Sequence, residues 1–346
     1  MAYAPILPGS HSRPCAAVRL LLMKVRLLKN VLRAALLLAA TGNALAATYT
    51  LPVGKDTVIG EVQKVVAAHE DTLLDIGRRY GVGYEEIVAA NPGINAWLPG
   101  AGTEVLIPSR YILPDAPREG IVVSLSEHRL FYFPPHKPGE AAVVRTYPIS
   151  VGRMDWHTPL GLTHIVNKRE KPIWYPPESV RKEHEADGRP LPKAVPPGPD
   201  NPLGEFAMRL GIPGGAYLIH GTNRPSGVGM QVTHGCVRMY PEDIKELYPM
   251  VPLNTPVHLV DQPYKMGWRG EQLFMEVHTP LEGTDSTDAH SLTNITKMLV
   301  AATQDRPVVI DWAKAERTFE LASGIPEPVM LSVPTTVQVT SDTAGR

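Results

Sequence analysis

The sequence predicts a mainly β central domain, with a small βααβ unit before it and a small α/β subdomain after it. Short segments in residues 120–260 are rich in β-branched and aromatic side chains, and several alternate apolar with polar residues. Glycine and proline separate these segments, and the chain contains 35 prolines among 346 residues, about double the usual share of roughly 5%. This composition favours short strands and ordered loops over helical bundles.

Residues 1–46 have the pattern of a secretory signal peptide. Four Lys/Arg residues between positions 24 and 33 precede a short apolar core and an Ala-Leu-Ala cleavage site at 44–46. The core is too short to span a membrane, and an N-terminal membrane anchor is the alternative. Met23 is the expected start, which makes residues 1–22 a spurious extension. We therefore expect export to the periplasm and no membrane span in the mature chain.

Removal of this segment also removes Cys15, so Cys236 is the one cysteine of the mature chain. It then has no partner for an internal disulfide and is either a nucleophile or a buried, inert side chain. The removed segment holds six of the 34 Lys and Arg residues and no acid, so 28 basic residues face 35 acidic ones, a net charge near −7. Since no basic patch stands out, nucleic acid is not an expected partner.

Residues 62–108 predict a β-α-α-β unit. Strands are expected at Val62–Ala67 and Glu104–Ile107. The first helix is expected in "EDTLLDIGRRYG", with Asp71 or Thr72 as its N-terminal cap. The second is expected in "GYEEIVAANPG", where the Asn-Pro-Gly sequence ends it.

This unit resembles a LysM module. The matching residues are Asp71-Thr72-Leu73, Ile76, Tyr80, Ile87, Asn91-Pro92 and Val105-Leu106-Ile107-Pro108. The resemblance implies a fold that binds the N-acetylglucosamine backbone of cell-wall glycans. We expect such a unit to raise the local glycan concentration around a second domain, and we expect its deletion to spare the turnover of small soluble substrates.

The central domain begins near residue 119. Successive strands are expected in "GIVVSLSEHRLFYF", "VVRTYPISVG" and "LGLTHIVNKRE". Residues 172–202 hold nine prolines and predict a long irregular segment, which is either functional or a disordered insertion. The remainder predicts a strand in "GAYLIHG", a short helix in "YPEDIKELYPMV" and a closing strand in "TPVHLV".

Residues 264–330 predict a small α/β subdomain whose purpose the sequence does not indicate. It contains one clear strand at Gln272–Val277 and two helices, at Leu292–Thr303 and Asp311–Ala322. Residues 331–346 are polar and are expected to form a disordered tail.

The stretch "YLIHGTNRPSGVGMQVTHGCVRMY" contains the candidate functional residues. A histidine beside a thiol can take the thiol proton and later give it to a leaving amine. His220 ends an apolar strand, and Cys236 follows Gly235, where the N–H groups of His234, Gly235 and Cys236 could converge on one carbonyl oxygen. Arg238 suits a substrate carboxylate, with a structural ion pair as its alternative.

Two other interpretations remain open at this point. Two histidines and one cysteine supply at most three metal ligands and lack the spacing of a zinc motif, so neither a metal nor another cofactor is expected. Two core histidines beside an unreactive cysteine would need no chemistry at all. Spacing alone does not decide between these interpretations and a thiol–imidazole pair.

"HGTN" followed by "THGCVRM" resembles the signature of the L,D-transpeptidase family, with its YkuD-type catalytic domain. "PPGPDNPLGEFAMRL" and "TPLGLTHI" are similar to segments of the same domain. The resemblance covers residues 119–262 and implies a β-sandwich-like catalytic fold. In weaker form it extends to "YKMGW" and "LFMEVHTPL", which are similar to the enterobacterial branch that tethers a lipoprotein to peptidoglycan.

On this sequence, the resemblance implies that Cys236 is the acylated nucleophile and His220 the acid/base. The Gly221 carbonyl would hold the second ring nitrogen of that histidine, where other enzymes use a carboxylate. His234 and Gly235 would shape the oxyanion loop rather than exchange protons.

Three further residues are implied to contact or orient the donor: Arg238, Asn223 and Thr233, the last of which stands where serine is commoner. The implied substrate is a tetrapeptide stem of peptidoglycan. The implied acceptor is another stem, which gives a 3-3 cross-link, or the C-terminal lysine of a lipoprotein. The alternatives are a hydrolytic cysteine endopeptidase or carboxypeptidase and a non-catalytic wall-binding protein.

Overall fold

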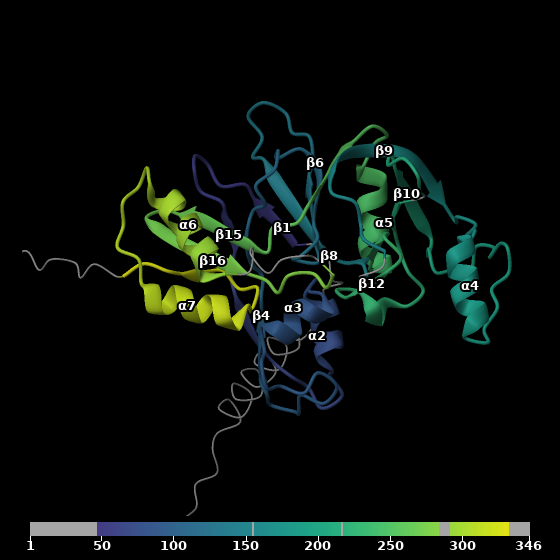
Figure 1. Cartoon of the computed structure of the whole chain (residues 1–346), viewed down its shortest axis with the longest axis horizontal. Helices are drawn as coiled ribbons and strands as arrows, with labels where there is room; N and C mark the ends of the chain where they lie inside the picture. Colours follow the sequence, from purple (N-terminus) through teal and green to yellow (C-terminus); the bar gives the residue numbers. More distant parts are fainter. Residues whose placement is uncertain (1–46, 154–155, 216, 284–290, 332–346) are drawn as a thin grey trace, which may run out of the picture. The chain divides into compact units, whose positions relative to one another are not determined.

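The computed structural model describes residues 47–153, 156–215, 217–283 and 291–331, and Figure 1 labels its helices and strands. All of these residues belong to one compact unit. The predicted signal peptide with its extension, and residues 332–346 of the predicted tail, lie outside them. No helix of the described part has both the length and the hydropathy needed to cross a membrane.

Eight strands of the central domain form a closed ring. They are β6 (Gly120–Ser124), β7 (Arg129–Phe133), β8 (Val143–Gly152), β9 (Gly161–Glu170), β10 (Phe206–Leu210), β11 (Leu218–His220), β13 (Val237–Met239) and β14 (Pro256–Val260). Each pairs with the next in the order β8-β13-β11-β10-β9-β14-β6-β7, and β7 pairs back with β8. The central domain is therefore a β-barrel. The sandwich-like expectation is wrong, because the pairing of β7 with β8 closes the sheet on itself.

The barrel interior is the largest apolar core of the described residues. Side chains that point inward from all eight strands form one buried cluster, which includes Ile121, Leu130, Ile149, Met208 and Val257. β7 is buried on both faces, because Phe131 and Phe133 on its outer face join a second cluster with Tyr111. Because both faces are buried, the sequence of β7 does not alternate between apolar and polar residues.

Two short strands and a helix complete the central domain. β1 (Ala47–Thr50) pairs antiparallel with the first residues of β8, and β12 (Gln231–Thr233) pairs parallel with its last ones. Helix α5 (Pro241–Met250) begins with a proline and two acidic residues, which suit the first turn of a helix, and it buries Ile244 and Leu247 against the barrel core.

The N-terminal module (residues 58–112) contains the predicted β-α-α-β order, which is confirmed. Its elements are β2 (Val58–Gly60), β3 (Gln63–Val66), α2 (Leu73–Arg79), α3 (Tyr84–Ala89), β4 (Glu104–Ile107) and β5 (Arg110–Ile112). Thr72 caps α2: its hydroxyl accepts from the Asp75 N–H at 3.1 Å, and the Asp75 carboxylate accepts from the Thr72 N–H at 3.1 Å. Antiparallel pairing joins β3 to β4 and β2 to β5.

A buried ion pair joins the N-terminal module to the barrel. Arg129 at the start of β7 is fully buried, and its guanidinium donates to both carboxylate oxygens of Glu86 in α3 at 2.6–2.8 Å. The same guanidinium lies 4.3 Å from the centre of the Tyr111 ring. Because a buried charge without its partner is costly, neither side chain can be removed without a large loss of stability.

Backbone hydrogen bonds make a second connection between module and barrel. The N–H groups of Tyr84 and Glu85 donate to the carbonyls of Val228 and Gly229, both at 3.1 Å. Gly229 has a φ of +89°, and a Cβ on it would lie 2.2 Å from the Tyr84 nitrogen, so only glycine permits this approach. The contacted segment lies between the two candidate catalytic residues in the chain.

The C-terminal subdomain (residues 264–331) has its own core. Its elements are β15 (Tyr264–Arg269), β16 (Gln272–Val277), α6 (Leu292–Thr303), α7 (Trp312–Leu321) and β17 (Glu327–Pro328). The helices lie beside the β15–β16 hairpin (Figure 1) and bury Ile295, Leu299 and Ala315 against it. The predicted strand and both predicted helices are confirmed, whereas β15 was not foreseen.

Residues 172–202, expected to be irregular, contain helix α4 (Glu178–Ala186). The helix buries one residue, Val180, so its sequence carries almost no apolar periodicity that could have predicted it. Asn201 fixes the end of the segment, since its side-chain amide donates to the carbonyl of Pro172 at 2.8 Å.

Candidate active site

Two parallel strands position the candidate catalytic residues. β11 and β13 pair so that His220 lies opposite Arg238, and Cys236 comes directly before β13. Residues in register on neighbouring strands, and residues two apart along one strand, point to the same face of a sheet. The pairing therefore places the side chains of His220, Cys236 and Arg238 on one face of the barrel wall.

The ring of His220 is buried and is held by its own neighbour. Its Nδ1 lies 2.6 Å from the carbonyl oxygen of Gly221. Because a carbonyl can only accept, Nδ1 carries the hydrogen and Nε2 keeps a free lone pair. Burial lowers the pKa of His220 to about 3, and the charge of Arg238 adds to this effect. The imidazole is thus neutral at pH 7 and can accept a proton at Nε2.

Cys236 has a thiol rather than a thiolate in the resting site. Burial raises the pKa of Cys236 to about 11, although a hydrogen bond with the Leu218 backbone and the charge of Arg238 act in the opposite direction. With a neutral imidazole and a neutral thiol, the resting site holds no thiolate–imidazolium ion pair. A reaction at the sulfur would need a base to take the thiol proton as the new bond forms.

The turn before Cys236 is fixed by hydrogen bonds to its carbonyl groups. The Thr233 hydroxyl donates to the carbonyl of Cys236 at 2.6 Å, and the Thr158 hydroxyl donates to the carbonyl of Gly235 at 3.2 Å. Gly235 has a φ of +89°, which a residue with a side chain rarely adopts. Thr233 is 2% exposed, so the expected substrate contact of this residue is corrected: its hydroxyl closes the turn.

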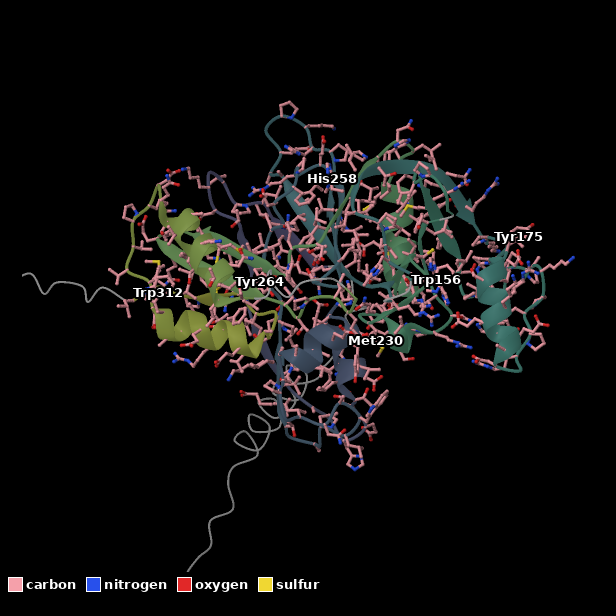
Figure 2. The ribbon with its side chains drawn as sticks, in the orientation of Figure 1. Trp156, Tyr175, Met230, His258, Tyr264 and Trp312 are labelled. Atoms are coloured by element: carbon pink, nitrogen blue, oxygen red, sulfur yellow. The ribbon has the colours of Figure 1, made fainter. Side chains whose placement is uncertain are left out.

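A carboxylate on helix α4 holds the other histidine. Nε2 of His234 lies 2.9 Å from a carboxylate oxygen of Glu183, whose second oxygen accepts from Arg153 at 2.8 Å. These hydrogen bonds lower the pKa of Glu183 to about 2. Trp156, labelled in Figure 2 on the loop after β8, meets the His234 ring edge-on, with 5.3 Å between the ring centres. No pattern in the sequence identifies Glu183, Arg153 or Trp156 as part of the site.

The other two predicted substrate contacts differ in availability. Arg238 Nε is buried and has no hydrogen-bond partner among the described residues, and burial lowers the pKa of its guanidinium. An incoming carboxylate would satisfy that donor. The side-chain amide of Asn223 already donates to the carbonyl of Pro199 at 3.0 Å, which leaves mainly its oxygen for a substrate.

One cluster of the described residues has the composition of a metal site. Glu127, Glu276 and His278 each place a ligand atom within 4.8 Å of the others. The ammonium group of Lys265 lies between the two carboxylates, 2.5 Å from Glu127 and 2.8 Å from Glu276. This ammonium supplies the positive charge that the buried carboxylates need, so the cluster is a structural ion network.

Two cavities lie near the site. The larger, about 500 Å³, is lined by the end of β8, residues 157–160 and residues 281–283, and neither His220 nor Cys236 lines it. The smaller, about 270 Å³, lies between the N-terminal module and the barrel, with Trp97 on one side and Pro225–Ser226 on the other.

Known proteins match this chain over most of its length. A family model described as the L,D-transpeptidase catalytic domain (YkuD) matches residues 118–259. Over 291 residues the chain is 37% identical to the probable L,D-transpeptidase YcfS of Escherichia coli (strain K12). This match covers 83% of this chain and 89% of the relative. It is 38% identical over 256 residues to the probable L,D-transpeptidase ErfK/SrfK of the same organism, with 73% and 80% covered. For the probable L,D-transpeptidase YbiS, identity is 35%, and 82% of this chain and 92% of the relative are covered.

Proposed function

Because this chain belongs to the L,D-transpeptidase family and acts on peptidoglycan, we propose that Cys236 is its acylated nucleophile and His220 its general base. The observation that carries this proposal is the hydrogen bond from His220 Nδ1 to the Gly221 carbonyl. That bond leaves Nε2 unprotonated on the face shared with the thiol, which a proton acceptor for Cys236 requires.

The first half-reaction forms a thioester. The sulfur of Cys236 attacks the carbonyl carbon of the diamino acid at stem position three, while His220 Nε2 takes the thiol proton. The carbon–sulfur bond forms, the bond to the terminal D-Ala breaks, and the proton passes from His220 to the departing amino group. At the end of this step His220 is neutral again, and the stem is bound to Cys236 as a thioester.

Two features of the site fit the charge that develops in this step. The carbonyls of Gly235 and Cys236 accept hydrogen bonds from the Thr158 and Thr233 hydroxyl groups, which fixes the turn whose N–H groups would donate to the oxyanion. Arg238 has an unpartnered Nε among the described residues and binds a carboxylate of the stem. It thereby distinguishes the donor peptide by its negative charge.

The second half-reaction transfers the acyl group to an amine. The neutral amine attacks the thioester, the new carbon–nitrogen bond forms, and the carbon–sulfur bond breaks. The proton lost by the amine passes through His220 to the sulfur. The acceptor is the side-chain amine of another stem or the C-terminal lysine of a lipoprotein, and the enzyme works in the periplasm after export.

The N-terminal module, by its LysM-like pattern, holds the glycan part of the substrate. Trp97 is 60% exposed beside the smaller cavity. Its backbone N–H donates to Asn95 Oδ1 at 2.9 Å, which fixes the loop that carries the ring. An exposed aromatic face suits a sugar ring. Pull-down with purified sacculi should weaken for Trp97→Ala relative to Val66→Ala, an exposed apolar residue elsewhere in the module.

Mass spectrometry tests the proposed nucleophile. With a disaccharide tetrapeptide, the wild-type protein should release D-Ala and carry one stem acyl group per chain. A carbapenem should likewise leave one adduct. Cys236→Ser should remain folded and lose all but a few per cent of turnover, because a hydroxyl ionises far less readily than a thiol. An adduct that persists in Cys236→Ala would place the nucleophile elsewhere, and products in which only water has replaced D-Ala would indicate a hydrolase.

A further inference from the structure

The larger cavity directly adjoins the turn that carries the nucleophile. A Cβ built on Gly152, which lines the cavity, would lie 3.1 Å from the Cα of Gly235. Thr158, another lining residue, donates its hydroxyl to the Gly235 carbonyl at 3.2 Å. Since Gly235 precedes Cys236, residues of the cavity wall directly contact the turn that carries the sulfur.

The cavity combines apolar walls with one carboxylate. Leu125, Val151 and Leu281 are buried around it, and Leu160 at its rim is 61% exposed. Asp261, the one charged residue that lines it, has a buried Oδ1 without a hydrogen-bond partner among the described residues. Burial raises the pKa of Asp261, although a hydrogen bond with the Ser126 side chain acts in the opposite direction. A cation that entered the cavity would offset the cost of burying this carboxylate.

The C-terminal subdomain supplies part of this cavity and is tied to the strand before the nucleophile. Leu281 and Gly283 follow β16. The backbone of Glu282 between them makes two hydrogen bonds with the side-chain amide of Gln231: its N–H donates to Oε1 at 2.9 Å, and its carbonyl accepts from Nε2 at 3.2 Å. Gln231 begins β12, which leads to the turn at Cys236. The subdomain thus has a direct connection to the reacting part of the barrel.

We propose that this cavity is the acceptor subsite, which binds an aliphatic ammonium group of the kind found on a diamino acid or lysine side chain. The methylene groups contact Leu125, Val151 and Leu281, and the ammonium group pairs with Asp261 before it loses a proton and attacks the thioester. The proposal rests on the proposed function, in which an amine resolves the acyl-enzyme. It gives the C-terminal subdomain a role in acceptor binding.

Charge separates this subsite from the donor side. The donor stem carries the terminal carboxylate of D-Ala, which the Arg238 guanidinium attracts through its unpartnered Nε and an ionised Asp261 repels. The acceptor carries a positive charge, for which the preference is reversed. The Arg238 cation therefore favours the donor stem at one position, and the Asp261 carboxylate favours the acceptor amine at the other.

The test separates the two half-reactions in the full-length protein. Nα-acetyl-lysine amide serves as the acceptor probe, and the acyl-enzyme formed from a tetrapeptide donor is followed by mass spectrometry. Asp261→Asn should raise the KM for the probe by about tenfold or more, the effect of losing one charge-assisted hydrogen bond, while the acyl-enzyme still accumulates. Unchanged KM in this variant would overturn the proposal.

The exposed rim provides a variant pair that does not disturb the core. Leu160→Lys should raise the KM for the cationic probe and Leu160→Glu should lower it, since the two changes place opposite charges at the cavity mouth. Leu162→Lys is the matched control: Leu162 lies in β9, two residues after Leu160, is 70% exposed and does not line the cavity. Equal effects of Leu160→Lys and Leu162→Lys would exclude this cavity as the acceptor subsite. If the wild-type protein forms no acyl-enzyme at all, the proposed function itself fails.

Discussion

His220 and His234 both precede Cys236 in the chain, but different groups hold their rings. The Nδ1 of buried His220 donates to a backbone carbonyl, so its Nε2 is an acceptor. The Nε2 of His234 faces the Glu183 carboxylate, which can only accept, so that nitrogen carries a hydrogen and cannot take a second one from a thiol. These hydrogen bonds therefore support His220, rather than His234, as the proposed base.

His220→Ala should slow acylation of Cys236 at pH 7 by about 10²–10⁴-fold, the usual worth of general acid–base help. Without the base, the rate should follow the thiolate fraction. Because burial raises the pKa of Cys236 to about 11, that fraction is about 10⁻⁴ at pH 7 and grows about tenfold with each pH unit. Acylation rates measured from pH 5 to pH 10 should therefore rise steeply in this variant.

The wild-type protein and His234→Ala serve as the comparison. Burial lowers the pKa of His220 to about 3, so the wild-type base stays unprotonated over the same range and its acylation rate should change little with pH. His234→Ala should lower the rate by loosening the turn, without a steep slope. A steep rise with pH in His234→Ala, and none in His220→Ala, would assign the base to the other histidine.

At this scale the sequence indicates the proposed reacting residues but not the residues that hold them. His220 and Cys236 stand out because small residues and a recognisable spacing surround them. Glu183 and Thr158 lie 51 and 77 residues from the residues they hold, and no local pattern marks such a contact. Thr233 was misassigned because a hydroxyl next to a nucleophile has the same appearance whether it faces a substrate or its own turn.

At the scale of elements, the contact of α3 with β7 depends on a buried ion pair. Glu86→Gln should reduce the free energy of unfolding by about 3–5 kcal/mol, because it leaves the fully buried Arg129 without its partner. Urea denaturation followed by tryptophan fluorescence measures this loss. Glu104→Gln is the control: its pair with Lys64 is 60% exposed and should change stability by at most about 1 kcal/mol. Similar losses in the two variants would contradict a special role for the buried pair.

Strong elements were predictable and their closure was not. The mainly apolar sequences of β8 and β16 identify these strands with their bounds. β11 and β13 have three residues each, too few for a periodic pattern. The barrel closes because β8 pairs with β7 as well as with β13. This pairing is a property of the three-dimensional arrangement, and no single segment of the sequence encodes it.

At the scale of the whole molecule, the N-terminal module is a structural part of the site and not a tethered unit. We expected its deletion to spare small soluble substrates, but Tyr84 and Glu85 hydrogen-bond to the segment between His220 and Cys236. Deletion of residues 58–112 should therefore lower the melting temperature and abolish turnover of a soluble tetrapeptide. Full turnover by the deleted protein would show that the module is separable after all.

β1 protects an edge of the barrel sheet, and its removal by proteolysis would expose that edge. Its four residues cover the backbone of Val143–Thr146 in β8, where the barrel sheet would otherwise present unpaired N–H and C=O groups. A free stretch of this kind accepts an extended segment of any other chain, and is a common origin of polymers and amyloid-like aggregates. A protease that removed Ala47–Thr50 would leave the barrel in place but expose the edge of Val143–Thr146 to pairing with another copy of the protein.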